Sequence, residues 1–430
     1  MNRNIVTAEL PNGIRVICMA ARKFKTISMG FFLHHELRAD LATANALLPA
    51  VLERGNRRYP DNLTLRRELE RLYGAELSTG ILKKGERHII SCSMEMVHGR
   101  HVGEGEDLLR KGFAILAAVA AEPLEEEGGF SGDYVAQEKD QLAKQIKGLI
   151  NDKAVYALEK CIQAMCAGEP FGVFRLGRLE DLERLDPVSL MDHYRRILSH
   201  NPIDLYVVGD LDPEQVLAVA NESFNFKREP AMEAFPVVEF YREPPEVKFQ
   251  EEIMAVNQAK LVMGYRTNIS YADPLYCALL MYNGILGGFP HSKLFLNVRE
   301  KASLAYYVYS RLEKHKGLMM VAAGIESSDY EKAREIIEEQ VADLAAGKIS
   351  ATEMENTRRG LINQLRVKDD NPYQMIDFHL DGAIGGRAYT VEEMIRGIEA
   401  VTPEAVQAVA GKVRLDTVYL LKGREGGAAA

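Results

Sequence analysis

The 430-residue sequence contains no tryptophan and only five cysteines, and no apolar run reaches the roughly 18 residues that a membrane-spanning helix needs. Nothing in the sequence explains the absence of tryptophan. The cysteines are odd in number and form no Cys-x-x-Cys pair, so they suggest neither a zinc ribbon nor a thioredoxin-type site. We expect buried free thiols in a reducing cytoplasm at Cys18, Cys92, Cys161, Cys166 and Cys277.

Positive charge is also in short supply. There are 53 Lys and Arg residues against 62 Asp and Glu, a net charge of −9, which argues against a protein dominated by contacts to nucleic-acid phosphates. No apolar segment typical of a secretory signal follows Met1, which favours the cytoplasm. Hydrophobic residues make up 47% of the chain, enough to exclude a disordered protein. Walker loops, strand-following GxGxxG motifs and GxSxG elbows are all missing.

The local patterns predict a mixture of strands and helices. Asn12-Gly13 between two alternating runs predicts a hairpin, and Thr26–His34 and Ile203–Gly209 read as strands. Residues 41–53 look helical although Pro49 falls inside them, and Pro49 should kink that helix or start a new one. Further helices are expected over residues 63–73, 105–121, 134–149, 152–166 and 187–198.

The second half of the sequence repeats the first. Each half has the order strand, helices, strand pair, several helices, strand, and such grouped runs indicate an α+β fold. A proline-rich, charged stretch at residues 225–248 reads as a linker. We therefore expect two similar domains, at residues 1–224 and 249–425, and a disordered tail at 426–430. The matching stretches are Ile27–Phe31 with Ala259–Tyr265, residues 79–91 with 309–321, and Ile203–Val208 with Asp416–Leu421.

A specific motif occupies residues 283–306, Asn-Gly-Ile-Leu-Gly-Gly-Phe-Pro-His-Ser-Lys-Leu-Phe-Leu-Asn-Val-Arg-Glu-Lys-Ala-Ser-Leu-Ala-Tyr. It resembles the second-half signature of the M16 (pitrilysin-type, insulinase-like) zinc peptidases. The resemblance implies that Arg299 and Tyr306 contact a peptide substrate, after a glycine-bearing loop with Gly284, Gly287 and Gly288. A guanidinium can donate to peptide carbonyls as a fixed fork, and a phenol can donate to a developing oxyanion. The alternative is that Arg299 pairs with a nearby carboxylate and that Tyr306 simply packs.

The catalytic motif of that family is missing from the first half. Active members carry an inverted His-x-x-Glu-His motif on a helix, in which two histidines bind zinc and the glutamate acts as general base. Aligned on the flank Leu52–Pro60, those positions hold Ala46, Pro49 and Ala50. The family's third zinc ligand matches Glu138, and a supporting glutamate is replaced by Ser131. One carboxylate cannot hold a catalytic zinc, so we expect no metal, and Glu138 is expected to be a surface or paired carboxylate.

Two other histidine pairs have ligand-like spacing. His98 and His101, with Glu104 and Glu106 nearby, are the better candidates for a replacement metal site, and the alternative is a polar loop. His34 and His35 are adjacent on a strand and should point to opposite faces, so they cannot chelate together.

The resemblance implies a fold of two tandem M16-type (LuxS/MPP-like) α+β domains, each an antiparallel sheet packed with helices, forming half of a clamshell. It also implies a noncatalytic, substrate-binding subunit that completes the active site of a zinc-carrying partner with an intact HxxEH motif. Extended peptides or unfolded polypeptides would be the substrate, and a homodimer in isolation is left open. No nucleic acid, membrane or cofactor of its own is expected. The alternative is a structural M16-fold protein without a role in proteolysis. Asn151–Ala157 and Leu205–Asp210 are similar to bacterial M16-like proteins associated with 5-aminopentanol modification of elongation factor P.

Overall fold

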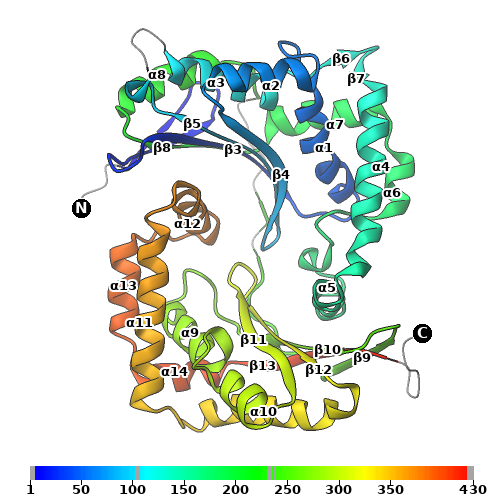
Figure 1. Cartoon of the computed structure of the whole chain (residues 1–430), viewed down its shortest axis with the longest axis vertical. Coiled ribbons are helices and arrows are strands. Elements are labelled where there is room, and N and C mark those ends of the chain that lie inside the picture. Colours follow the sequence, from blue (N-terminus) through cyan, green and yellow to red (C-terminus); the bar gives the residue numbers. More distant parts are fainter. Residues whose placement is uncertain (1–4, 103–106, 230–234, 237, 424–430) are drawn as a thin grey trace. The chain divides into compact units, whose positions relative to one another are not determined.

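The computed structural model describes residues 5–102, 107–229, 235–236 and 238–423. Its contacts divide the chain into two compact units, each built on one large sheet (Figure 1). Unit 1 comprises Met1–Lys147 and Val173–Pro236, and unit 2 comprises Gly148–Gly172 and Val237–Ala430. The segment 148–172 therefore belongs with the second unit, whereas the domain boundaries drawn from the sequence stay a prediction. The predicted disordered tail lies outside the described residues.

Unit 1 contains a six-stranded sheet with the strand order β1-β2-β8-β3-β5-β4. All neighbours are antiparallel except β2 and β8, which run parallel. The hairpin predicted at Asn12-Gly13 joins the first two strands, and the positive φ of 81° at Gly13 suits a residue without a Cβ. The strands are β1 (Ile5–Glu9), β2 (Arg15–Ala20), β3 (Thr26–Glu36), β4 (Glu76–Lys84), β5 (Arg87–Val97) and β8 (Ile203–Gly209).

Unit 2 contains a five-stranded sheet with the order β11-β12-β10-β13-β9. Its only parallel pair among the described strands is β13 with β9. The strand order repeats between the two units, as the duplication predicted. Read from β4 toward β2, the unit 1 sheet has the order β4-β5-β3-β8-β2, and the equivalent order in unit 2 is β11-β12-β10-β13-β9. Strand β1 has no described counterpart in unit 2. The strands are β9 (Lys248–Ile253), β10 (Ala259–Arg266), β11 (Ala305–Glu313), β12 (Leu318–Ile325) and β13 (Arg414–Lys422).

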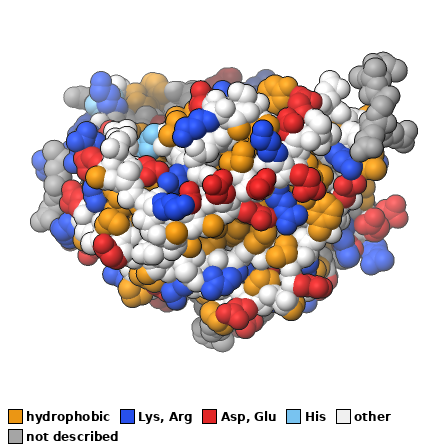
Figure 2. All heavy atoms as spheres, turned by 90° about the horizontal axis from the view of Figure 1, so that it is seen from below, with side chains coloured by type: hydrophobic (Ala, Val, Ile, Leu, Met, Phe, Trp, Pro, Cys, Tyr) orange, Lys and Arg blue, Asp and Glu red, His pale blue; other side chains and the backbone are white. Residues whose placement is uncertain are grey.

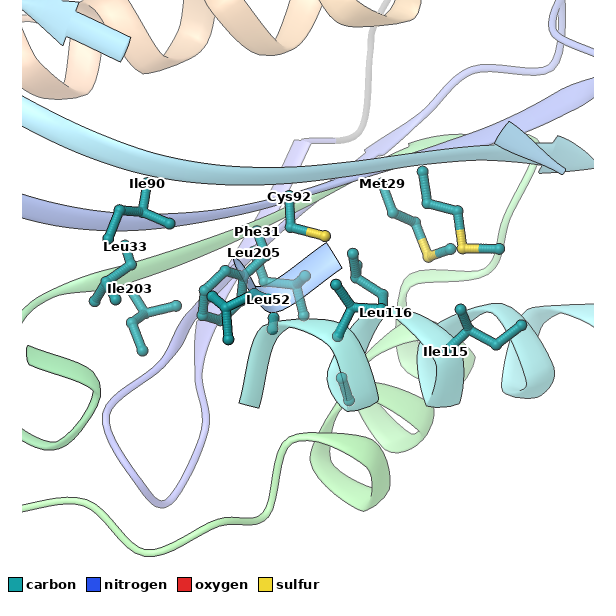
Figure 3. Close-up of a cluster of buried hydrophobic side chains, with 14 of the residues drawn as sticks. Met29, Phe31, Leu33, Leu52, Ile90, Cys92, Ile115, Leu116, Ile203 and Leu205 are labelled. Carbon is teal, nitrogen blue, oxygen red and sulfur yellow. The ribbon is translucent and has the colours of Figure 1, made fainter. Parts of the chain in front are cut away.

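Helices cover one face of the unit 1 sheet. Figure 3 shows how side chains of β3, β5 and β8 meet Leu52 of α1 and Leu116 of α3 in one apolar cluster. Burying each such side chain contributes about 1.5–3 kcal/mol to the stability of the unit. A small ribbon of β6 (Glu125–Glu126) and β7 (Gly129–Phe130) precedes α4. The helices are α1 (Ala42–Arg54), α2 (Asn62–Arg71), α3 (Leu108–Ala121), α4 (Gly132–Gly148), α6 (Leu179–Arg184), α7 (Pro187–His200) and α8 (Pro213–Ser223).

The unit 2 sheet is covered on both faces. Leu261, Met263 and Val321 belong to the core shared with the C-terminal helices, whereas Val262, Met320 and Tyr419 pack against α5 (Lys153–Met165). Alternate residues of the strands thus serve two separate cores. The other helices are α9 (Tyr276–Asn283), α10 (Tyr330–Ala345), α11 (Ala351–Lys368), α12 (Pro372–Gly385), α13 (Val391–Glu399) and α14 (Pro403–Ala410). The predicted α+β architecture, with sheets packed against helices, is confirmed.

A buried group of charges anchors the segment 148–172 within unit 2. Glu169 follows α5, and its carboxylate lies 2.6 Å from Arg266 of β10, 2.6 Å from Arg242 and 2.9 Å from Lys316. Burial acts to raise the pKa of Glu169, but the hydrogen bonds from Arg266 and Lys316 outweigh it and lower that pKa to about 2. Arg266 also reaches Asp416 of β13 at 3.0 Å. Each buried charge therefore has an opposite charge at hydrogen-bonding distance.

No helix within the described ranges combines the length and apolar character needed to cross a bilayer. The face shown in Figure 2 interleaves Lys and Arg with Asp and Glu. The net negative charge is therefore not gathered into a field of one sign on this face.

Candidate functional site

Helix α1 carries the positions that replace the zinc motif, and it runs unbroken through Pro49. Because proline has no N–H, the carbonyl of Asn45 loses its usual helical donor. Of the two outcomes expected at Pro49, a kink or the start of a new helix, the second does not occur. Helix α1 is rich in alanine and almost wholly buried, so tertiary packing overrides the local penalty. The hydroxyl of Thr79 on β4 contacts this helix, 2.9 Å from the Pro49 carbonyl and 2.7 Å from the Glu53 carboxylate.

The four positions that correspond to zinc-site residues line one pocket within unit 1. Ala46 and Ala50 lie one helical turn apart on α1, with Pro49 beside them, and Glu138 faces them from α4. The pocket encloses about 640 Å³, including space open to solvent. Its remaining lining residues are Leu47, Glu53, Thr79, Gly80, Ile81, Leu142, Gln145, Arg175 and Leu176.

The donor set in this pocket does not fit zinc. Two methyl groups and a pyrrolidine ring offer no lone pair, and zinc in proteins takes nitrogen, sulfur or carboxylate ligands. Glu138, 8% exposed, forms an ion pair with the guanidinium of Arg54 at the end of α1. Glu138 is thus a buried, paired carboxylate, one of the two arrangements expected from the sequence. Ser131, at the position of the supporting glutamate, is buried just before α4.

Asn45 of α1 forms a polar cluster with His88 and His193, which the sequence did not predict. Asn45 accepts a hydrogen bond from His193 Nε2 at 2.7 Å, and its amide lies 3.4 Å from His88 Nδ1. His88 Nε2 lies 2.8 Å from the Arg175 carbonyl, so this ring is neutral with its proton on Nε2. Burial lowers the pKa of His88 to about 4 and that of His193 to about 3. The only sequence signal is an asparagine within an Ala- and Leu-rich helix.

The other histidine pairs are engaged in hydrogen bonds. His98 Nε2 lies 2.8 Å from the Asp210 carbonyl, and His98 Nδ1 accepts from the backbone N–H of Arg100. Neither nitrogen of His98 has a lone pair left for a metal, and Glu104 and Glu106 lie outside the described residues. His34 and His35 have separate partners, the former 3.2 Å from Asp204 and the latter against the Glu36 carbonyl. Within the described part of the chain, no group of three or more His, Cys, Asp or Glu side chains could hold a metal ion.

The expected glycine-bearing loop is a helical turn instead. Gly284–Gly288 forms a π-helical turn, η4, that continues α9. A Cβ on Gly284 would lie 2.4 Å from Thr357 Cγ2, and one on Gly287 would lie 2.5 Å from the backbone nitrogen of Ser310 on β11. Packing against neighbouring elements therefore explains both glycines. Gly288 is less confined, since its Cβ would lie 3.2 Å from Asn283.

Arg299 lies in a second π-helical turn, η5 (Phe295–Lys301). Its side chain is 43% exposed, with the guanidinium 4.7 Å from the centre of the Phe295 ring and 3.8 Å from the Glu300 carboxylate. Stacking on an aromatic ring orients the fork while leaving its N–H groups accessible. π-helical turns occur often at functional sites, so this geometry is compatible with a binding role.

Tyr306 lies at a β-bulge, where the register of β11 against β12 shifts between Ala305 and Tyr307. Bulges re-aim side chains, and this one leaves Tyr306 55% exposed. Its hydroxyl donates to Glu326 Oε1 at 2.6 Å, and this hydrogen bond raises the pKa of Tyr306. Arg299 and Tyr306 therefore each have their own contacts in unit 2, on elements that pack together. An exposed hydrogen bond of this kind can be exchanged for one to a ligand.

Comparison with known proteins identifies the family. A family model described as "Peptidase M16 inactive domain" matches residues 184–361. The chain is 38% identical, over 96% of its length and 97% of the relative's, to the probable inactive metalloprotease YmfF of Bacillus subtilis. The chain belongs to the M16 peptidase family.

Solved structures agree with this M16 assignment. A conserved protein from Enterococcus faecalis matches with a TM-score of 0.90 and 27% identity, over 99% of this chain and 100% of that one. A peptidase M16 inactive domain from Pseudomonas fluorescens matches with a TM-score of 0.81 and 17% identity, over 99% and 100%, and shows the fold alone. Together with the lost zinc ligands, the inactive relatives make this chain a noncatalytic M16 member.

Proposed function

We propose that this chain is the noncatalytic, substrate-binding subunit of a two-chain M16 zinc peptidase in the cytoplasm. The observation that carries the proposal is a contrast between two sets of residues. The zinc-motif positions Ala46, Pro49 and Ala50 offer no metal ligand to the pocket that they line, whereas Arg299 and Tyr306 remain exposed on a π-helical turn and a β-bulge. Zinc would be carried by a partner with an intact HxxEH motif, and the substrate would be an extended or unfolded polypeptide.

The chemistry of the two exposed residues supports a role at a reacting peptide. A guanidinium held over Phe295 offers several N–H donors to the carbonyls of an extended chain. A phenol that exchanges its bond to Glu326 for one to the scissile carbonyl would stabilise the negative charge that develops there, an effect worth about 3–4 kcal/mol for one donor in known sites. The partner would supply the metal and the general base.

The experiment uses the purified chain alone and mixed with an M16 protein of the same organism that keeps the HxxEH motif. Alone, the chain should contain no stoichiometric zinc and should leave fluorescein-labelled casein uncut. The mixture should cleave casein faster than the partner alone. R299A should lower kcat/KM of the mixture by about 10- to 100-fold, the loss of about 1.4–2.7 kcal/mol of transition-state stabilisation. Y306F, which removes the proposed oxyanion donor, should lower it by about 100- to 1,000-fold.

Matched controls separate a binding role from a structural one. R311A removes an exposed arginine of the same strand as Tyr306 that is paired with Glu313, and Y241F removes an exposed tyrosine hydroxyl bonded to Glu243. Both should leave the mixture fully active. Chelator-sensitive cleavage by the isolated chain would contradict the proposal, as would R299A and Y306F mixtures with unchanged kinetics.

A structural, nonproteolytic role is the second candidate, and one observation favours it. Packing alone accounts for Gly284 and Gly287, so their presence requires no ligand. In that case the chain would associate with another protein without changing casein cleavage, and the R299A and Y306F variants would behave like R311A.

A further inference from the structure

Strand β9 forms an edge of the unit 2 sheet, and its counterpart in unit 1 does not. In unit 1, β2 is paired on its outer side with β1, whereas in the described part of unit 2 no strand pairs with the outer side of β9. The internal repeat thus shows what the missing neighbour would be, an antiparallel strand. Unpaired edges of this kind are templates for joining another strand.

The outer edge of β9 presents free backbone groups in a defined pattern. The N–H of Met254, next after β9, donates to the Lys422 carbonyl of β13 at 3.0 Å. Because successive residues of a strand direct their N–H and C=O groups to opposite sides, those of Phe249, Glu251 and Ile253 point away from β13. Proline, the usual protection of such an edge, is absent from β9.

Three apolar side chains at β9 are exposed on one face, on which Glu251 also lies. Phe249 and Ile253 are 52% and 55% exposed, and Val247, just before the strand, is 47% exposed. All three lie on the same face by the alternation of the strand. On the opposite face, Lys248 donates to the Ala164 carbonyl and Glu252 accepts from Tyr156, and these contacts with uncharged groups leave both charges without an ion pair in the described part of unit 2.

We propose that β9 pairs with β9 of a second copy of this chain, antiparallel and across a two-fold axis at Gln250, to form a continuous ten-stranded sheet from two five-stranded ones. Charge complementarity selects both the occupant and the register. With Gln250 opposite Gln250, Lys248 of each copy lies opposite Glu252 of the other, and Val247 lies opposite Ile253. Cross-strand opposite charges and apolar pairs both stabilise a sheet.

Neighbouring registers juxtapose like charges. An axis at Lys248, Glu251 or Glu252 places each of these residues opposite itself, and an axis at Phe249 places Glu246 opposite Glu252. Like charges directly opposite each other are destabilising. In the Gln250 register, the backbone N–H and C=O of Phe249 in one copy face those of Glu251 in the other copy, as a hydrogen-bonded antiparallel pair requires. Arg299 and Tyr306 stay free in this dimer, because β11 is the other edge of the sheet.

The test measures the mass of the full-length chain by sedimentation equilibrium from 1 to 100 µM. The native chain should be a dimer. E251P removes an N–H that points away from β13 and keeps the backbone hydrogen bonds to β13. Each copy would lose one hydrogen bond to the other, and the proline ring would clash with the facing strand, so the dissociation constant of the dimer should rise at least about 100-fold. E251A, which loses the same side chain but keeps the N–H, should remain dimeric.

Crosslinking tests the register independently of folding effects. Under mild oxidation, Q250C should form a covalent dimer across the axis, because directly opposed Cα atoms in a non-hydrogen-bonded pair are about 4.5 Å apart. E251C should crosslink far less, and the native chain not at all.

A monomeric native chain overturns the proposal, and so does a dimer that E251P leaves intact or that E251C crosslinks more readily than Q250C. If the native chain is monomeric and E251P lowers casein cleavage in the mixture, the edge receives a different protein, which also overturns it. The proposal does not rest on the proteolytic role, so either can fail alone.

Discussion

Lowering the pH from 7 to 5 should destabilise unit 1 through His88. In the folded chain, burial lowers the pKa of this histidine from its ordinary 6.5 to about 4, although its hydrogen bond to the Arg175 carbonyl acts in the opposite direction. Between these two values the unfolded chain binds a proton that the folded chain does not. The free energy of unfolding therefore falls as the pH falls below 6.5, and no further loss from this group occurs below pH 4.

The size of the effect follows from the two pKa values. Each pKa unit corresponds to about 1.4 kcal/mol, so His88 alone should cost about 2 kcal/mol between pH 7 and pH 5. This window lies above the range in which Glu169, with a pKa of about 2, loses its charge. His193, whose pKa burial also lowers, should add to the slope.

The assay is urea unfolding at pH 7, 6 and 5, followed by circular dichroism and tyrosine fluorescence because the chain has no tryptophan. H88Q keeps an amide donor and acceptor for Arg175 and Asn45 but cannot titrate, so its pH slope should be smaller by about 2 kcal/mol over the window. H200Q makes the same His-to-Gln substitution at the end of α7, outside the cluster of Asn45, His88 and His193, and it serves as the control. An H88Q slope equal to that of the native chain refutes the reasoning.

Three further predictions concern packing and charge. G287A should destabilise unit 2 by about 1–3 kcal/mol in urea unfolding, because the added Cβ would lie 2.5 Å from the Ser310 nitrogen, and G288A should cost less; equal costs would contradict this argument. R54M should lower the free energy of unfolding at pH 7 by about 1–3 kcal/mol, since it leaves the Glu138 carboxylate buried without its cation. The double variant R54M/E138Q should recover most of this lost free energy. The graft A46H/P49E/A50H restores the motif residues, but it should bind zinc tightly only together with R54M, because Arg54 otherwise pairs with Glu138, the third ligand. Zinc content is measured by atomic emission and affinity by chelator competition. Tight binding by the graft alone would show that the ion pair does not compete with the metal.

Much of the architecture followed from local sequence patterns. Strand β8 has the bounds that its apolar run predicted, and the hairpin at Asn12-Gly13 follows from turn chemistry. The repeated strand order was visible because equivalent strands in the two halves bury the same kinds of side chains. Strand β9 was missed because Glu251 interrupts the apolar alternation of Val247, Phe249 and Ile253. Each of the two large sheets also has one parallel pair, whereas antiparallel sheets were expected.

The motif positions allowed the residues of the pocket to be predicted from the sequence, whereas the local backbone conformation depends on packing and could not be predicted. Ala46, Ala50 and Glu138 do line one pocket, although their roles stay a prediction. The continuation of α1 through Pro49 could not be predicted, because the burial that stabilises the helix comes from elements distant in sequence. The resemblance to the M16 signature implied a loop at Gly284–Gly288, whereas the structure has a helical turn there, and the absence of a Cβ at Gly287 allows close contact with β11.

The place of α5 in unit 2 has a consequence for synthesis of the chain. Helix α5 emerges from the ribosome before β8 completes the first sheet, but the strands that it covers, β10 and β13, follow about a hundred and about 250 residues later. At about 5–20 residues per second, its apolar stripe of Leu158, Cys161 and Ile162 stays uncovered for roughly 10–50 seconds. A nascent chain stopped in the 225–248 stretch would end with that stripe bare, so cutting the gene there would not separate two self-sufficient halves.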